Sequence, residues 1–127
     1  MIIKRGEIHL ASLDPAVGRE ISKTRPVVII SNDINNRFSG TVTVLPVTSK
    51  NMGKVYPFEV RLPKSDGNLP KDSKVKADQI RTLDKRRIIK PIGMLDNENI
   101  TRIETALKIH LGLEIPMENR TGVLGQT

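Results

Sequence analysis

Cysteine and tryptophan are absent from this chain of 127 residues, and apolar residues nowhere form a long run. Without cysteine, neither a disulfide framework nor a thiolate zinc site can form. The two histidines, His9 and His110, lie too far apart in the sequence to suggest a metal cluster. No apolar segment has the length of a signal-peptide core or of a membrane span. We therefore expect a cytoplasmic protein that uses no metal ion or other cofactor.

Aromatic residues are also scarce, since Phe38, Tyr56 and Phe58 are the only three. Many proteins that bind single-stranded nucleic acid hold the bases on stacked aromatic rings. A platform of that kind is not expected here, so bases would have to be held mainly by polar contacts and by arginine planes.

Positive charge, in contrast, is abundant. The formal net charge is +7 and the sequence pI is about 10.0, which favours polyanionic partners such as nucleic acid or an acidic protein. Between Lys71 and Lys90, eight basic residues stand against three acidic ones. A solvated surface without a partner explains such a run equally well.

Hydrophobic periodicity predicts short strands through most of the chain. Apolar and polar residues alternate, or β-branched residues run together, as is typical of strands. Six segments have this pattern: 7–13, 25–30, 41–47, 58–62, 74–79 and 88–95. Of the polar segments between them, 31–40 has room for one short helical turn, and 14–24 is expected to be an exposed, mobile connection.

A helical period begins only after Asp96, which suits an N-cap. Apolar residues fall on one stripe over 100–111, and Gly112 suits the C-cap. Short strands followed by one amphipathic helix predict an α+β fold, a small and partly open β-barrel of about six strands with the C-terminal helix against one end. We expect residues 1–113 to form a single domain and 114–127 to form a flexible tail.

Cleavage of RNA by its own 2′-hydroxyl requires removal of that proton, stabilisation of the charge that the phosphate gains, and protonation of the departing 5′-oxygen. Arg25 suits the second task, because its planar guanidinium matches phosphate oxygens and Pro26 restricts its backbone to an extended form. Thr48 ends an apolar run, and a hydroxyl there can donate to a phosphate or orient the attacking oxygen. Each residue also has a purely structural interpretation, Arg25 as a surface residue and Thr48 as a cap.

Three further polar residues have less clear roles. Gln79 continues the inward parity of Val75 and Ala77, and a buried amide must find hydrogen bonds either within the fold or with a substrate. The histidines are not expected to be catalytic, since His9 would lie on the outer face of its strand and His110 near the end of the helix.

Taken in order, these segments resemble the MazF/PemK family of toxins from toxin-antitoxin pairs. The resemblance extends from Lys4 to Leu113 and leaves out the tail. It rests on Leu13-Asp14-Pro15 with Gly18 and Glu20, Thr24-Arg25-Pro26-Val27-Val28, Ser31-Asn32-Asp33, Val44-Leu45-Pro46-Val47-Thr48-Ser49, Pro57-Phe58-Glu59-Val60, Lys71-Asp72-Ser73 and Ala77-Asp78-Gln79-Ile80-Arg81-Thr82. The order and spacing of these pieces are specific, rather than any one piece.

This resemblance implies an SH3-like barrel that forms a homodimer and cleaves single-stranded RNA at short sequence motifs. The reaction would need no metal, would leave a 2′,3′-cyclic phosphate and a free 5′-hydroxyl, and would inhibit translation and growth. The implied partners are single-stranded RNA and a cognate acidic antitoxin, whose disordered segment would fold over the RNA groove.

The resemblance also implies roles for individual residues. Arg25 and Thr48 correspond to the catalytic pair. We assign Arg25 to charge stabilisation, because a guanidinium stays protonated in proteins, and we leave the general base unassigned. The loop 49–56 varies within the family, so the recognised bases do not carry over. The residues expected to contact RNA are Glu20, Ser49, Lys76, Gln79, Arg81 and Arg86.

Two other functions stay open at this point. The gyrase-inhibiting toxin CcdB shares the implied fold, but the inhibitory end of that toxin carries a tryptophan, which this chain lacks. A non-catalytic RNA-binding SH3-like module would share both the fold and the positive charge.

Overall fold

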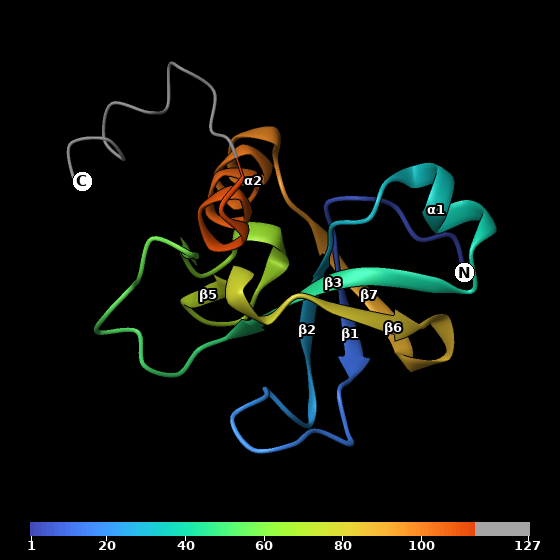
Figure 1. Cartoon of the computed structure of the whole chain (residues 1–127), viewed down its shortest axis with the longest axis horizontal. Coiled ribbons are helices and arrows are strands. Elements are labelled where there is room, and N and C mark those ends of the chain that lie inside the picture. The colour runs from blue at the N-terminus through green and yellow to red at the C-terminus, as the bar shows by residue number, and fades with distance from the viewer. Residues whose placement is uncertain (114–127) are drawn as a thin grey trace.

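The computed structural model describes residues 1–113, and the predicted tail 114–127 lies outside them. Its elements are β1 (Glu7–Ser12), β2 (Thr24–Ile29), α1 (Asp33–Phe38), β3 (Thr41–Thr48), β4 (Glu59–Leu62), η1 (Asp66–Asn68), β5 (Ser73–Lys76), η2 (Ala77–Gln79), β6 (Arg81–Asp84), η3 (Lys85–Arg87), β7 (Ile88–Met94) and α2 (Asn97–Leu111), where η marks a 3-10 turn. The predicted α+β fold is confirmed (Figure 1).

All strand pairs are antiparallel, and β3 organises them. Hydrogen-bonded neighbours follow the order β4-β5-β3-β2-β1-β7. Along one edge, β3 takes two partners, because 41–44 pairs with β6 and 47–48 pairs with β5. Among the described strands no ladder joins β7 to β4 or to β6, so the sheet curls without closing, as a partly open barrel requires.

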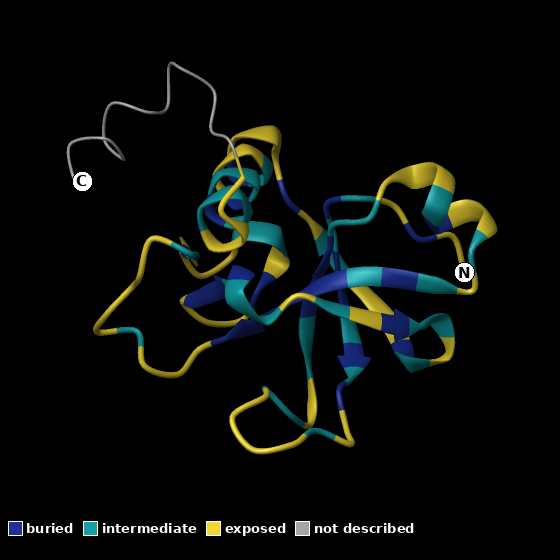
Figure 2. Cartoon of the chain, in the orientation of Figure 1, coloured by how far each residue is buried: buried dark blue, intermediate teal, exposed yellow. Residues whose placement is uncertain are grey.

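The buried apolar residues form two core clusters on opposite faces of the sheet, and Figure 2 shows buried segments on β1, β3 and β5. Val28 and Leu45 belong to the core beneath α2, whereas Val27 and Ile29 belong to the core on the opposite face. Successive side chains of a strand point to opposite faces. The run Val27 to Ile29 in β2 is therefore continuously apolar, because both faces of the strand are buried there.

α2 begins and ends where its caps predict. The Asp96 side chain accepts a hydrogen bond from the backbone of the first turn at 2.9 Å, and Gly112 adopts the left-handed conformation at the C-cap, with φ 67°. Ile103 and Ala106 are buried against the sheet. Within the part of the chain that the structure describes, no helix is both long enough and apolar enough to cross a membrane.

The order of strands after β4 differs from the prediction. The predicted strand 74–79 ends at Lys76, and the next three residues form η2. The chain then forms β6, which hydrophobic periodicity did not predict. Only Leu83 of its four residues is buried, and the strand is defined by its ladder with β3. Backbone pairing of this kind leaves little hydrophobic pattern in a sequence.

The predicted placement of His9 on an outer face is wrong. Its side chain is 1% exposed. The alternation of residues in β1 makes the face that carries His9 look polar, but the second core covers that face. His9 lies between Val27 of β2 and Pro91 of β7, and its Nε2 is 3.1 Å from the Glu7 carboxylate.

Gly93 of β7 packs directly on the turn at Gly67, and we expect Gly93→Ala to destabilise the fold. A Cβ at this position would overlap the Gly67 carbonyl group, and backbone cannot move aside as the end of a side chain can. Overpacking of this kind costs about 1–3 kcal/mol. The free energy of unfolding in urea should fall by that amount. In Gly40→Ala the added methyl meets nothing within 4 Å, so a loss as large in that variant would contradict the packing argument.

Candidate functional site

β2 and β3 bring Arg25 and Thr48 to the same end of one sheet face. Val27 pairs with Pro46, and the same antiparallel register extended by two residues places Arg25 opposite Thr48. Both side chains line one cavity of about 210 Å³. Two residues that are distant in the sequence therefore face a common space.

The Arg25 guanidinium is held at its base and open at its tip. Its Nε donates to the Ser22 carbonyl at 2.8 Å, which fixes the direction of the fork. Among the described residues, neither terminal nitrogen of Arg25 forms a hydrogen bond. These donors are therefore available to an anionic ligand in the cavity.

Thr48 is the last residue of β3 and is 8% exposed. Its Oγ1 accepts a hydrogen bond from the Lys50 backbone N–H at 3.1 Å, so the hydroxyl caps the chain as it leaves the strand. A hydroxyl can accept and donate at the same time. The capping bond therefore leaves the Thr48 proton free to donate to a ligand.

A buried carboxylate supports the floor of this cavity. Glu59 of β4 accepts hydrogen bonds from Lys76 Nζ at 2.7 Å and from Lys74 Nζ at 3.2 Å, and its side chain is fully buried. Burial raises the pKa of Glu59, but hydrogen bonds from Lys76, the Tyr56 backbone and Lys74 outweigh that effect, so the net pKa is lowered. Glu59 is thus an anion beneath a cationic surface.

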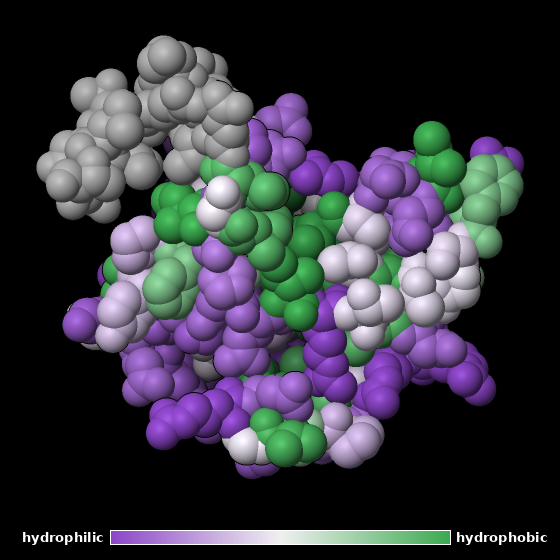
Figure 3. Space-filling model, in the orientation of Figure 1, coloured by the Kyte–Doolittle hydropathy of each residue, from purple (hydrophilic) through white to green (hydrophobic). Residues whose placement is uncertain are grey.

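The cavity lining is strongly basic. Five basic residues line it with no carboxylate among them: Arg19, Arg25, Lys50, Lys74 and Lys76. The single charge of Glu59 does not balance them. Figure 3 shows hydrophilic side chains gathered between β5 and the connection from β1 to β2, where this surface lies. Such a cavity suits a phosphate group.

A second cavity of about 390 Å³ adjoins the first. The two share Arg19, Ile21 and Gln79 in their linings, so they form one groove across the end of the sheet. Glu20 and Arg81 line the second cavity. The structure therefore brings Arg25, Thr48, Lys76, Gln79, Glu20 and Arg81 to this groove.

Gln79 and Arg81 also hold the connection from β1 to β2. Gln79 Oε1 accepts from the Ile21 backbone N–H at 2.8 Å, and its Nε2 donates to the Arg19 carbonyl at 3.2 Å. Arg81 donates to the Leu13 carbonyl at 2.6 Å. The expected inward strand position of Gln79 is wrong, because this residue is half-buried in η2. Its amide nevertheless has the structural partners that a buried amide requires.

Two predicted RNA-binding residues do not line the groove. Ser49 is exposed just beyond Thr48. Arg86 follows β6, and its guanidinium pairs with Asp84 at 3.0 Å while its side chain is 90% exposed. Asp84 lies opposite Thr41, at the other end of β3 from Thr48 and roughly 23 Å away at the usual strand rise. Within one chain, Arg86 is therefore remote from Arg25.

Arg19 and Lys74 are lining residues that sequence reasoning missed. Arg19 lies in a connection without apolar period, where no local signal marks one charged residue over the next. Lys74 alternates with Val75 in the sequence, a position typical of a solvent-facing residue, yet it is 3% exposed. Glu59, the buried partner of Lys74, gave no signal either, because it alternates with Phe58 and Val60 as a solvent-facing strand residue does.

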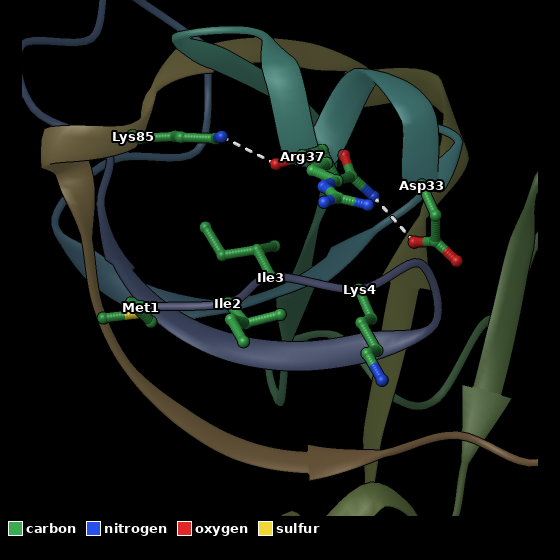
Figure 4. A pocket seen from close by; sticks show the side chains of 8 residues that line it. Met1, Ile2, Ile3, Lys4, Asp33, Arg37 and Lys85 are labelled. Carbon is green, nitrogen blue, oxygen red and sulfur yellow. Dashed lines mark hydrogen bonds between the residues drawn. The ribbon is translucent and has the colours of Figure 1, made fainter.

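A larger cavity of about 450 Å³ lies away from this groove, between the N-terminal segment and α1 (Figure 4). Within its lining, Lys85 Nζ donates to the Asn36 carbonyl at 2.6 Å and the Asn36 amide donates to Asp33 at 3.3 Å. None of the predicted site residues lines it. Among the described residues, no three His, Asp or Glu side chains converge as metal ligands would.

Comparisons with known proteins extend over nearly the whole described chain. A family model for PemK-like, MazF-like toxins of type II toxin-antitoxin systems matches residues 4–111. The chain is 42% identical over 117 residues to the endoribonuclease MazF9 of Mycobacterium tuberculosis, covering 88% of this chain and 98% of MazF9. It is 40% identical over 113 residues to the endoribonuclease EndoA of Bacillus subtilis, covering 89% and 97% respectively.

Solved structures have the same fold. MazF from Deinococcus radiodurans superposes with a TM-score of 0.77 at 29% identity, covering 89% of this chain and 99% of that one. An endoribonuclease from a mycobacterial species, solved in complex with its cognate antitoxin, gives a TM-score of 0.74 at 28% identity, with coverage of 90% and 99%.

We expect Glu59 to stabilise the fold only where it is ionised. Glu59→Gln leaves two lysines near a neutral group, and breaking a buried ion pair costs about 3 kcal/mol. Because the folded pKa lies below the ordinary value of 4.5, the contribution is complete above pH 4.5 and is lost as the pH falls through the folded pKa. Urea unfolding at several pH values should therefore show a difference between wild type and variant that shrinks in acid.

The exposed Glu98→Gln provides the control, since Glu98 has no such partners among the described residues. Its role in the first turn of α2 is a solvent-screened interaction with the helix dipole, so Glu98→Gln should lower the unfolding free energy much less than Glu59→Gln does. A Glu59→Gln effect that is independent of pH would contradict the ion-pair interpretation.

Proposed function

Because the chain belongs to the PemK-like, MazF-like family of toxins of type II toxin-antitoxin systems, we propose that it cuts single-stranded RNA at short sequence motifs without a metal ion. It is a MazF-like endoribonuclease toxin of such a system. The observation that supports the proposed reaction is the shared cavity of Arg25 and Thr48, lined by cations and adjoined by a longer groove.

The proposed reaction is an internal transfer at phosphorus. The 2′-oxygen of one nucleotide attacks the adjacent phosphorus, the bond from phosphorus to the 5′-oxygen breaks, and the products are a 2′,3′-cyclic phosphate and a 5′-hydroxyl. One proton leaves the 2′-hydroxyl and one joins the 5′-oxygen. The negative charge that builds on the phosphate needs fixed donors, because preorganised donors stabilise a transition state without reorganising.

Arg25 and Thr48 would supply those donors. The open end of the Arg25 guanidinium suits two phosphate oxygens, and its bond to Ser22 limits the directions it can take. The Thr48 hydroxyl, oriented by the Lys50 N–H, would donate to a phosphate oxygen or orient the attacking 2′-oxygen. The general base stays unassigned.

The groove provides a path for the RNA on either side of the cut. We propose that Glu20, Lys76, Gln79 and Arg81 contact the strand along it, and that Ser49 does so from the loop beyond Thr48. We propose that Arg86 also contacts RNA. Its distance from Arg25 within one chain means that it would act on a remote part of the strand or from a second chain.

The proposed partners follow from charge. A chain of net charge +7 with a cationic groove favours an acidic, initially disordered antitoxin segment that folds over the groove and competes with RNA. A structural relative was solved in complex with its cognate antitoxin. We further propose that the toxin acts in the cytoplasm as a homodimer and inhibits translation and growth.

Incubation of the pure protein with a long RNA in EDTA tests the activity directly. Discrete cuts bearing cyclic phosphate ends are expected. Binding without cuts would favour a non-catalytic RNA-binding module, and neither binding nor cuts would favour a CcdB-like gyrase poison.

The same assay tests the two central residues. Arg25→Ala and Thr48→Val should each lower the cleavage rate by at least ~100-fold, the scale of one lost transition-state donor. Thr48→Ser keeps the hydroxyl and should retain most activity. Arg37→Ala removes an exposed guanidinium on α1, outside both cavities, and should cut as wild type does. If the Arg25→Ala variant and the Thr48→Val variant each kept full activity, the assignment of these two residues to catalysis would be wrong.

The proposed homodimer is tested by sedimentation equilibrium. The expected mass is twice the 14.2 kDa of one chain. A mass of one chain at the concentrations at which the protein cuts RNA would contradict the dimer while leaving the cleavage proposal intact.

A further inference from the structure

The loop between β3 and β4 begins at the candidate site. It covers residues 49–58, directly after Thr48 and before Glu59. Most of its residues are exposed and it contains no regular element. Its outer part has contacts of its own, because Tyr56 stacks on Phe58 with ring centroids 5.3 Å apart. Lys54 Nζ lies 4.8 Å from the Tyr56 ring centroid.

The inner part of the loop is held by one buried lysine. Lys74 Nζ donates to the Asn51 carbonyl at 3.0 Å, to the Lys54 carbonyl at 3.0 Å and to Glu59 Oε1 at 3.2 Å. An ammonium group has three donors, and all three are used. Lys74 is 3% exposed, so these bonds form where water does not compete effectively.

The same lysine is the cross-strand partner of Thr48. In the ladder between β3 and β5, Lys74 lies directly opposite Thr48, and Arg25 lines the same cavity as both residues. Directly opposed residues have Cβ atoms about 5 Å apart. One side chain thus joins β5, the strand paired with β3 at Thr48, to the loop that follows Thr48.

We propose that Lys74 is a positioning residue that fixes the loop 49–58 relative to Thr48 and so helps to determine which bases flank the cut. This inference rests on the proposed RNA cleavage. Lys74 need not touch the reacting phosphate for this role, because it acts through the backbone carbonyls of Asn51 and Lys54. The nucleobases next to the scissile phosphate would be the ligands of the loop that it holds.

The contacts predict which properties depend on Lys74. Without its ammonium, the two loop carbonyls lose their donor and the loop can shift. Glu59 keeps Lys76 and the Tyr56 N–H as partners, and Thr48 keeps its place in β3. Selectivity among bases should therefore suffer more than the cleavage step itself.

The test is Lys74→Met in the full chain, which keeps the aliphatic length and removes the charge and donors. The wild-type motif is first read by sequencing the 5′ ends of fragments from a long RNA. kcat/KM is then compared for a short RNA with that motif and for RNAs that differ by one flanking base. The ratio of kcat/KM for the motif RNA to kcat/KM for the changed RNAs should fall about 10-fold in Lys74→Met, the scale of one lost base contact. The change in kcat on the motif RNA should be smaller.

Two further variants separate positioning from general damage. Lys74→Arg, which restores a cation and several donors, should recover part of the selectivity. Lys90→Met removes an exposed lysine of β7 outside both cavities and should leave the ratio unchanged. An equal loss of kcat/KM on every RNA, or an unchanged ratio in Lys74→Met, would overturn the positioning role.

A measurement on the native protein applies even if Lys74→Met does not fold. Amine acetylation, followed by mass spectrometry of peptides, should modify Lys74 far more slowly than Lys90. Equal rates would overturn the inference, because the loop would then not be held. A wild type that does not cut RNA would instead overturn the proposed function itself, so the two failures are distinguishable.

Discussion

The antiparallel pairing of β2 with β3 is the constraint on which the rest of this structure depends. β3 pairs with β2 on one edge and with both β5 and β6 on the other. Val27, Val28 and Ile29 are buried on alternate faces of β2. A slip of one residue would therefore exchange the contents of the two cores. The same register, continued two residues beyond this ladder, brings Arg25 opposite Thr48, so hydrophobic burial and the geometry of the site both depend on it.

Charge beneath the groove is organised differently from charge on its surface. Burying a carboxylate or an ammonium is costly unless each finds partners in good geometry, and Glu59, Lys74 and Lys76 meet that condition together with backbone groups. The lysines therefore contribute both positive potential in the groove and defined positions for the chain around it. Arg25 differs, because its terminal nitrogens are not used within the described residues.

Much of this fold could be predicted from the sequence, for reasons that particular residues make clear. Asp96 and Gly112 are local capping signals, and both are confirmed. The strand β2 was predicted from its β-branched run, and the residues of that run are buried in the two cores. β6 and the burial of His9 and Lys74 could not be predicted, because they depend on which strands lie beside them and on what covers the outer face. The grouping of Arg25 with Thr48 came from the family resemblance, since their spacing in the chain contains no sign of the ladder that joins them.

The connection from β1 to β2 is anchored by the buried Leu13 in the second core and, over its exposed part, by hydrogen bonds to its main chain. Arg81, Arg87 and Gln79 donate to its carbonyls, from Ser12 to Arg19, and Gln79 also accepts from the Ile21 N–H. Anchors that recognise only peptide groups are indifferent to the side chains attached to them. The exposed positions 17 and 19 can therefore exchange their side chains during evolution while the path of the segment persists, which gives a lineage of such proteins a way to change what they bind without rebuilding the fold.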